Sequence, residues 1–319
     1  MQFIRKAARQ CELHLCRAVF LLNLSSHDKK IMKIIVESGA SKSDWRLIGK
    51  DGREKRKLLA GGMNVSTMQM KGISEIIHEA GQILTDAAES KISSVHFYTA
   101  GVITDDIRSD LSSVLSSVFP DAEIEIQNDL TAAARAACGH NPGIVAILGT
   151  GSNSCQYDGK EIVKRVYSSG YILGDEGSAA TLGKLFIADF LKGLVPEHIS
   201  REFSSRYDSS YATIVENVYR SGSSPSGYLG SFAPFIMEHY SDSYIKSLVD
   251  RNFRDFFRRS IKQYDYEDCP VGIVGGFGFA LRDIILSVAE EEGVKISGFM
   301  QCPIEGLIRY HADSQARSE

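Results

Sequence analysis

The 319-residue sequence is notable first for what it lacks. Its longest apolar stretch near the start, Ala18 to Leu24, is too short to span a bilayer. Acidic and basic residues are interspersed and nearly balanced, with a formal net charge of −4. A broad basic face for nucleic acid or an anionic membrane is therefore not expected. We expect a small molecule as the partner, with no nucleic acid and no membrane, and we also allow for a homodimer.

Cysteine patterns typical of metal or redox sites are missing as well. The six cysteines are scattered, without a C-x-x-C pair and without a histidine at metal-ligand spacing. We interpret them as reduced thiols of a cytoplasmic protein. The first 31 residues, with a basic start, do not continue the pattern that follows, and no small-x-small cleavage site follows their apolar run. We treat 1–31 as an N-terminal extension of doubtful order, either an upstream start or a loosely attached helix.

Apolar periodicity is abundant, and it repeats. From Met32 the chain reads strand, glycine-serine loop, strand, Asp51-Gly52 turn, strand; from Gly143 it reads the same order with an Asp158-Gly159 turn. An Asp-Gly pair between strand-like runs predicts a hairpin in which both turn residues have positive φ. The length and the duplication predict two similar α/β lobes.

Around these two motifs the periodicity predicts further elements. We expect helices over 67–90 and 104–119, strands over 93–102 and 122–129, and a mainly helical stretch over 178–264. A buried strand, a glycine turn and a helix follow over 270–294, and a short helix over 304–310. Trp45 is expected in the core, and Arg254, Arg258 and Arg259 are expected to form one solvated helix face.

The glycine loops exclude two common nucleotide sites. GSAATLGKL has the wrong spacing for a Walker A loop, and Gly149-Thr150-Gly151 lacks the third glycine of a dinucleotide fingerprint. A glycine-hydroxyl loop between antiparallel strands can still bind phosphate through exposed backbone N–H groups, with donors from Thr150, Ser152 and Asn153. The alternative for each loop is a tight hairpin without a ligand.

Six segments in order carry a family resemblance: VESGASKSDW, QNDLTAAA, ILGTGSNS, GYILGDEGSA, IVGGFGFAL and CPIEGLIRYH. This series resembles the actin-like ATPase superfamily of sugar kinases, Hsp70 and actin, and within it the N-acetylglucosamine kinase branch of the BadF/BadG/BcrA/BcrD-type ATPase family. The resemblance implies two ribonuclease H-like lobes with an interlobe cleft. The lobes would be 32–131 plus 304–319, and 132–303.

The resemblance also implies an ATP-dependent carbohydrate kinase that uses Mg²⁺ and phosphorylates an amino sugar, most simply N-acetylglucosamine. Asp129 would be the catalytic base, the alternative being that Asp129 or Asn128 only caps a helix. Glu37 would hold Mg²⁺ where the family carries Asp, and Ser41 stands where it carries Thr. The implied phosphate and adenosine contacts are Ser38, Gly39, Ala40, Ser41, Lys42, Gly149, Thr150, Gly151, Ser152, Gly275, Gly276 and Gly278.

On the sugar side, the resemblance implies binding by Asn64, Gly170, Tyr171 and Asp175. Ser169-Gly170-Tyr171 replaces the Trp-Gly-His run of related amino-sugar kinases, so the sugar itself stays open. Asp175-Glu176 could instead be an exposed helix N-terminus. Two other functions remain as alternatives. One is an ATPase activator of the dehydratase or reductase type, disfavoured by the missing cysteine pair. The other is a non-catalytic nucleotide or sugar sensor, suggested by Glu37.

Overall fold

The computed structural model describes residues 31–39, 42–65, 68–101, 104–220, 224–316, with side chains described up to residue 312. The expected extension 1–31 therefore lies, apart from Ile31, outside the described residues, as do Ala40 and Ser41. Contacts divide the chain into two compact units, Met1–Ile126 and Gln127–Glu319. Each unit contains one five-stranded sheet, which confirms the predicted two-lobed α/β fold. The predicted lobe boundaries stay a prediction.

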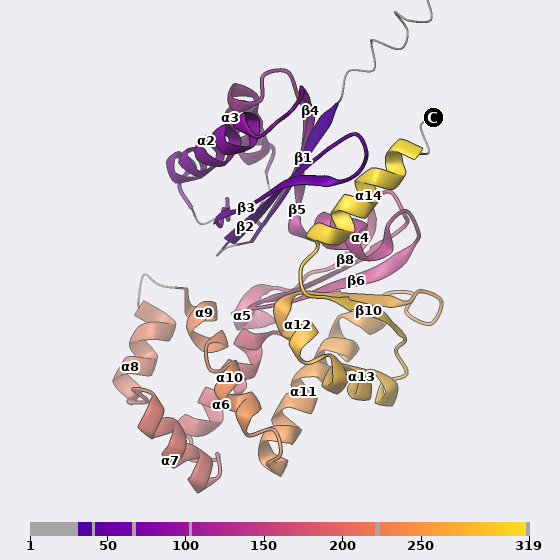
Figure 1. Cartoon of the computed structure of the whole chain (residues 1–319). Coiled ribbons are helices and arrows are strands. Elements are labelled where there is room, and N and C mark those ends of the chain that lie inside the picture. Colours follow the sequence, from indigo (N-terminus) through magenta and orange to yellow (C-terminus); the bar gives the residue numbers. More distant parts are fainter. Residues whose placement is uncertain (1–30, 40–41, 66–67, 102–103, 221–223, 317–319) are drawn as a thin grey trace, which may run out of the picture. The chain divides into compact units, whose positions relative to one another are not determined.

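The first unit is a sheet covered by two helices (Figure 1). Its elements are β1 (Met32–Ser38), β2 (Lys42–Ile48), β3 (Glu54–Gly61), α2 (Met70–Asp86), β4 (Ile92–Thr99), α3 (Asp105–Val118) and β5 (Glu123–Asn128), whose last two residues pass into the second unit. The strand order is β3-β2-β1-β4-β5, with β1 antiparallel to β2 and parallel to β4. Trp45 is fully buried against Phe97, as expected for a core residue.

The second unit repeats this plan with a long helical insertion. Its elements begin with α4 (Asp129–Cys138), β6 (Gly143–Leu148), β7 (Ser152–Tyr157), β8 (Ile162–Val166), α5 (Gly170–Leu173), α6 (Ala179–Leu191), α7 (Glu197–Arg206) and α8 (Tyr211–Val215). They continue with a π-helix (Glu216–Arg220), α9 (Pro225–Gly230), α10 (Ala233–Glu238), α11 (Ser243–Arg259), a 3₁₀ turn (Ile261–Gln263), β9 (Val271–Val274), α12 (Gly276–Ala280), α13 (Arg282–Glu291), β10 (Ile296–Met300) and α14 (Ile304–Ala316).

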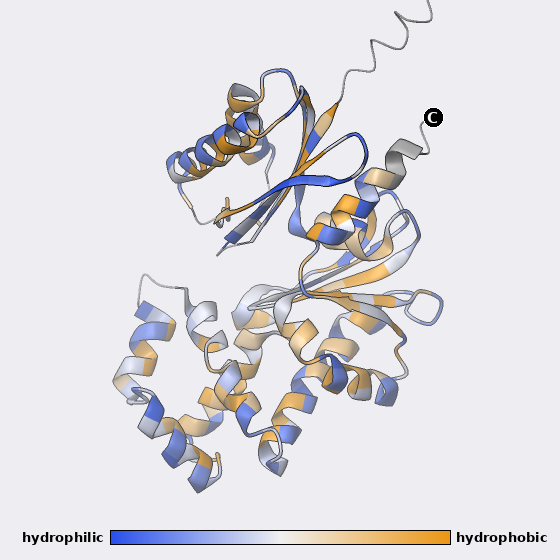
Figure 2. Cartoon of the chain, viewed as in Figure 1, coloured by the Kyte–Doolittle hydropathy of each residue, from blue (hydrophilic) through white to orange (hydrophobic). Residues whose placement is uncertain are grey.

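The strand order β10-β9-β6-β7-β8 mirrors that of the first unit. β6 is antiparallel to β7 and parallel to β9, as β1 is to β2 and β4. The helices of this unit show orange and blue patches along their length (Figure 2), the pattern of amphipathic helices packed on one side. The predicted duplication is therefore confirmed at the level of topology.

Two local expectations are wrong. Gly52 and Gly159 have positive φ, but Asp51 and Asp158 do not, so neither turn has the expected conformation. In the first turn Gly49 N donates to Arg53 O and Gly52 N donates to Gly49 O, which makes a three-residue loop ending in a left-handed glycine. The edge strand β10 was not expected, and its partly exposed residues explain the weak signal.

Among the described residues, no helix combines the length and the apolar character needed to cross a bilayer.

Candidate functional site

In the second unit, three glycine-rich or acidic segments meet at one edge of the sheet. β6 and β9 are parallel, so the turns that follow them, at Gly149 and Gly275, lie at the same edge. α4 runs antiparallel to these strands, because its last residues, Ala137 and Cys138, lie close to the starts of β9 and β6. The start of α4, which carries Asp129, is thus placed at the edge of the two glycine turns.

The Gly149–Gly151 turn is shaped for an anion. Gly149 N donates to Gly151 O at 3.0 Å, while the carbonyls of Gly149 and Thr150 accept the N–H groups of Ala179 and Ala180 at the start of α6. Within the described residues, no hydrogen bond uses the N–H of Thr150 or Gly151. Successive unused N–H groups in a turn form an anion-binding nest, so this turn fits a phosphate group.

The second glycine turn packs directly on the first. Gly275 has φ 122° and a Cβ there would lie 2.4 Å from the carbonyl oxygen of Leu148, so only glycine fits. A Cβ at Gly278 would lie 2.7 Å from the Ile273 side chain, whereas one at Gly276 would meet nothing within 4 Å. Gly276 therefore leaves open space beside the Gly149–Gly151 turn, where a nucleoside could approach the backbone.

Asp129 is buried at the start of α4 but is not the cap of this helix. The N-cap of α4 is Asn128, whose Oδ1 accepts the N–H of Thr131 at 2.8 Å. Asp129 Oδ1 accepts only the neighbouring N–H of Leu130, at 2.9 Å, among the hydrogen bonds described. Burial raises the pKa of Asp129 above its ordinary value, while the Leu130 N–H and the charge of Arg165 partly offset this rise. A raised carboxylate pKa suits a general base.

Asp175 is buried and lies beside the Gly149–Gly151 turn. The alternative that Asp175 belongs to an exposed helix N-terminus is therefore ruled out. Its Oδ1 accepts the N–H of Ser152 at 3.3 Å, and a Cβ at Gly151 would lie 3.1 Å from its Oδ2. The N-cap of α6 is instead Ser178, whose hydroxyl accepts the N–H of Thr181 at 3.1 Å. Burial raises the pKa of Asp175. The sequence did not signal this contact between the predicted sugar loop and the predicted phosphate loop.

The other predicted residues of the sugar loop adjoin Asp175. Gly170 and Tyr171 begin α5, where Gly170 is exposed with φ 70° and Tyr171 is partly buried. Lys184 Nζ donates to the Tyr171 carbonyl at 2.5 Å. The structure thus keeps all three predicted residues of this loop in one short segment of the second unit.

In the first unit, Glu37 projects from the end of β1. It pairs in register with Asp44 on β2 and with Tyr98 on β4, so these three side chains share one face of the sheet. Asp44 is already bound by Arg46 at 2.5 Å. Carboxylate oxygens suit Mg²⁺, so a metal ligand at Glu37 is chemically consistent, whereas both oxygens of Asp44 are engaged by Arg46.

Ser38 serves the framework of its loop. It is 1% exposed, and its Oγ accepts the N–H of Met63 at 2.8 Å. Gly39 N donates to Lys42 O at 3.0 Å and closes the loop, and the side chain of Lys42 is exposed. Because Met63 is tied to Ser38, the adjacent Asn64 lies near the end of β1, and its sugar contact stays a prediction.

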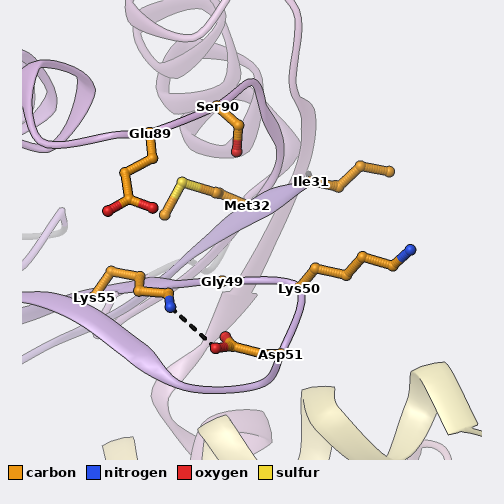
Figure 3. A pocket seen from close by; sticks show the side chains of 8 residues that line it. All are labelled: Ile31, Met32, Gly49, Lys50, Asp51, Lys55, Glu89 and Ser90. Atoms are coloured by element: carbon orange, nitrogen blue, oxygen red, sulfur yellow. Dashed lines mark hydrogen bonds and ion pairs between the residues drawn. The ribbon is translucent and has the colours of Figure 1, made fainter. Parts of the chain in front are cut away.

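One pocket lies at the other end of the first unit's sheet. Its volume is about 500 Å³, and Figure 3 shows the start of β1 at Met32 with Glu89 and the ion pair between Lys55 and Asp51. β1 rises about 3.3 Å per residue, which places this pocket roughly 20 Å from the loop after Ser38. The pocket is therefore separate from the candidate site.

The arginines of α11 are partly exposed, as expected for a solvated helix face, and each of them also forms an ion pair. Arg254 binds Glu291 at 3.0 Å, Arg258 binds Glu292 at 2.8 Å, and Arg259 binds Glu176 at 2.7 Å. α11 therefore contacts both α13 and the loop of Asp175.

Comparison with known proteins gives a specific relative. The "Putative N-acetylglucosamine Kinase" from Porphyromonas gingivalis is 38% identical, with a TM-score of 0.82, over 89% of this chain and 100% of that chain. The chain belongs to this family of N-acetylglucosamine kinase-like proteins. No protein-family model matches the chain, and no curated protein matches it.

More distant structures share the fold of this N-acetylglucosamine kinase-like chain. The "Putative N-acetylglucosamine Kinase" from Chromobacterium violaceum is 18% identical with a TM-score of 0.65, covering 88% of this chain and 98% of that chain. A ROK family glucokinase from Streptomyces griseus, in complex with glucose and AMPPNP, is 15% identical with a TM-score of 0.53, over 89% and 98%. The architecture is that of the actin-like sugar kinases.

Proposed function

We propose that the protein is an ATP-dependent kinase that phosphorylates a hydroxyl group of N-acetylglucosamine or a related amino sugar. The observation that supports it most is the meeting of the Gly149–Gly151 turn, the Gly275–Gly278 turn and Asp129 at one sheet edge. The family membership supports the same reaction. We also assign the chain to the BadF/BadG/BcrA/BcrD-type branch of the superfamily.

In this proposal the phosphates of ATP bind the free N–H groups of Thr150 and Gly151. The adenosine part lies against the open backbone at Gly276. Glu37 would hold Mg²⁺, which would supply positive charge to offset that of the phosphates. Ala40, Ser41 and Lys42 stay predicted phosphate contacts. Ser38 supports them by holding the loop to Met63.

The sugar binds through Asp175, with Asn64, Gly170 and Tyr171 as further contacts. Asp129 accepts the proton of the attacking sugar hydroxyl. At the same time the oxygen of that hydroxyl bonds to the γ-phosphorus and ADP leaves. Its raised pKa makes it a stronger base than an exposed aspartate.

The test is ADP release from ATP and Mg²⁺ with a panel of hexoses and amino sugars. We expect release only with an accepted sugar, best with N-acetylglucosamine, and a phosphorylated sugar in equal amount by mass spectrometry. Sugar-independent release would contradict the kinase proposal. Calorimetric binding of ATP and sugar without any turnover would favour a sensor instead.

A further inference from the structure

The loop that carries Asp175 has an unusual backbone. Among the described residues with a side chain, only Ser169 and Asp175 have positive φ, at 61° and 57°, and both lie in the segment 168–178. Gly170 and Gly177, in the same loop, have φ values of 70° and 79°. Non-glycine residues in this region are strained and persist only where surrounding contacts impose them.

Helix α11 supplies one set of the contacts that impose these positive φ values. Asn252 is fully buried; its Oδ1 accepts the N–H of Gly177 at 3.0 Å and its Nδ2 donates to the carbonyl of Ser178 at 3.2 Å. A Cβ at Gly177 would lie 2.8 Å from the Phe256 ring, so this backbone lies flat against α11. The side chain of Asn252 thus fixes the peptide group between Glu176 and Gly177 and the one between Ser178 and Ala179.

Arg259 is the last residue of α11 and follows Phe256 by three residues. It binds Glu176, the residue after Asp175. Its Nη1 lies 2.7 Å from Glu176 Oε1, and the side chain of Glu176 is only 12% exposed while that of Arg259 is 63% exposed. The pair therefore anchors a largely enclosed carboxylate from a solvent-accessible position. α6 holds the other part of the loop, through Lys184 on the Tyr171 carbonyl and Thr181 on that of Gly174.

The held loop reaches the phosphate turn through Asp175, whose Oδ1 accepts the Ser152 N–H. We propose that Asn252 and Arg259 are positioning residues, which hold the segment 168–178 so that Asp175 stays bound beside the Gly149–Gly151 turn. Neither residue belongs to the sites predicted from the sequence. The consequence for catalysis rests on the proposed function: the sugar loop and the phosphate turn act as one rigid piece, so loosening the loop weakens sugar binding more than it slows turnover.

Arg259→Gln is the informative variant, because its exposed position lets the chain fold. Arg258→Gln is the matched control, since Arg258 lies on the same helix with similar exposure but binds Glu292 instead of the loop. We expect Arg259→Gln to raise the KM for the sugar by roughly fivefold, in the lower range of coupling between sites, with a smaller change in kcat. Arg258→Gln should leave both constants near wild type, and Arg259→Lys should recover most of the loss.

Hydrogen exchange measured by mass spectrometry tests the loop itself without any substrate. We expect faster exchange in peptides covering 168–178 for Arg259→Gln and no change there for Arg258→Gln. Unchanged exchange in Arg259→Gln would overturn the positioning role. Faster exchange with an unchanged sugar KM would confine Arg259 to a structural role and overturn the coupling. If no sugar is phosphorylated by the wild type, the proposed function fails while the exchange result still decides the loop contacts.

The ion pair can be tested with Glu176→Gln. If Arg259 acts through Glu176, Arg259→Gln combined with Glu176→Gln should raise the sugar KM no further than Arg259→Gln alone. Independent, multiplying effects would show that Arg259 acts by another route. Asn252→Asp, which keeps the acceptor for Gly177 N–H and loses the donor to Ser178, should increase exchange in the same peptides; unaltered exchange would remove Asn252 from the proposal.

Discussion

The two units are built on the same strand order, and their differences lie at the ends of their central strands. In the first unit the last residue but one of β1 is Glu37, a carboxylate in register with Asp44. In the second, the equivalent position of β6 is the apolar Ile147, in register with Asn153. The second unit obtains its carboxylate from a different place, the loop of Asp175.

The connection between the third and fourth strands of each motif explains this difference. In the first unit it contains one described helix, α2, between β3 and β4. In the second it runs from Val166 to Val271 and contains α5 to α11. The duplicated motif thus places a similar loop after the first strand of each unit, and the insertion supplies the second loop with an acidic neighbour and a set of anchoring contacts.

The largest effect is expected from Asp129→Asn, which tests the acid that the second unit places at its glycine turns. Loss of a general base lowers turnover by roughly 10²–10⁴-fold. Stability should move the other way. The folded state raises the pKa of Asp129, so its favourable contribution exists below the ordinary pKa and is lost as pH rises towards the raised value. Asparagine stays uncharged at every pH, so it avoids the burial cost that the ionised carboxylate carries.

Two measurements check this prediction: kcat with the accepted sugar and Tm at neutral pH. We expect a large fall in kcat with an equal or higher Tm. Turnover that survives the substitution would remove Asp129 as the base, and a lower Tm would mean that the carboxylate stabilises the fold.

The next effect is on stability, from Gly275→Ala. Gly275 takes the place that Thr99 has in the first unit, where a side chain fits and donates to the carbonyl of Met63. In the second unit an added Cβ would lie 2.4 Å from the Leu148 carbonyl oxygen. We expect a loss of about 2–4 kcal/mol in the free energy of unfolding, measured with urea. Gly276→Ala is the control, because its Cβ meets nothing, and an equal loss there would contradict the argument.

Much of this plan could be predicted from the sequence, because local patterns carry it. The repeated strand-loop-hairpin signal predicted both sheets, and Asn128-Asp129 after an alternating strand predicted the start of α4. The hydrogen bonds of Asp175 and Asn252 had no such signal. Asp175 and Ser152 are 23 residues apart, Asn252 and Gly177 are 75 apart, and a positive φ at aspartate leaves no trace in composition. Tertiary contacts decide those positions.

A smaller effect on rate is expected at Glu37, where the first unit differs from the second. Glu37→Gln removes the charge and should lower kcat roughly 10–100-fold at limiting Mg²⁺, with partial recovery at high Mg²⁺. Glu37→Asp keeps the charge on a shorter side chain and should mainly shift the Mg²⁺ concentration for half-maximal rate. ADP release titrated with Mg²⁺ measures both. If both variants kept wild-type Mg²⁺ dependence and turnover, Glu37 would not be at the metal.

The smallest effect is expected from Arg165→Gln on β8. The counterpart of this strand in the first unit is β3, which has no described neighbour equivalent to Asp129. The charge of Arg165 lowers the pKa of Asp129, so its removal raises that pKa further. Because the base acts when ionised, the acid limb of kcat/KM against pH should move to higher pH while the alkaline plateau stays unchanged. Arg165 is exposed, so solvent screens its charge and keeps the shift small. The control is Lys164→Gln, because Lys164 is the adjacent exposed lysine and donates to the Gln263 carbonyl. It should leave the acid limb in place. An equal shift in this variant would mean that general surface charge sets the pH profile.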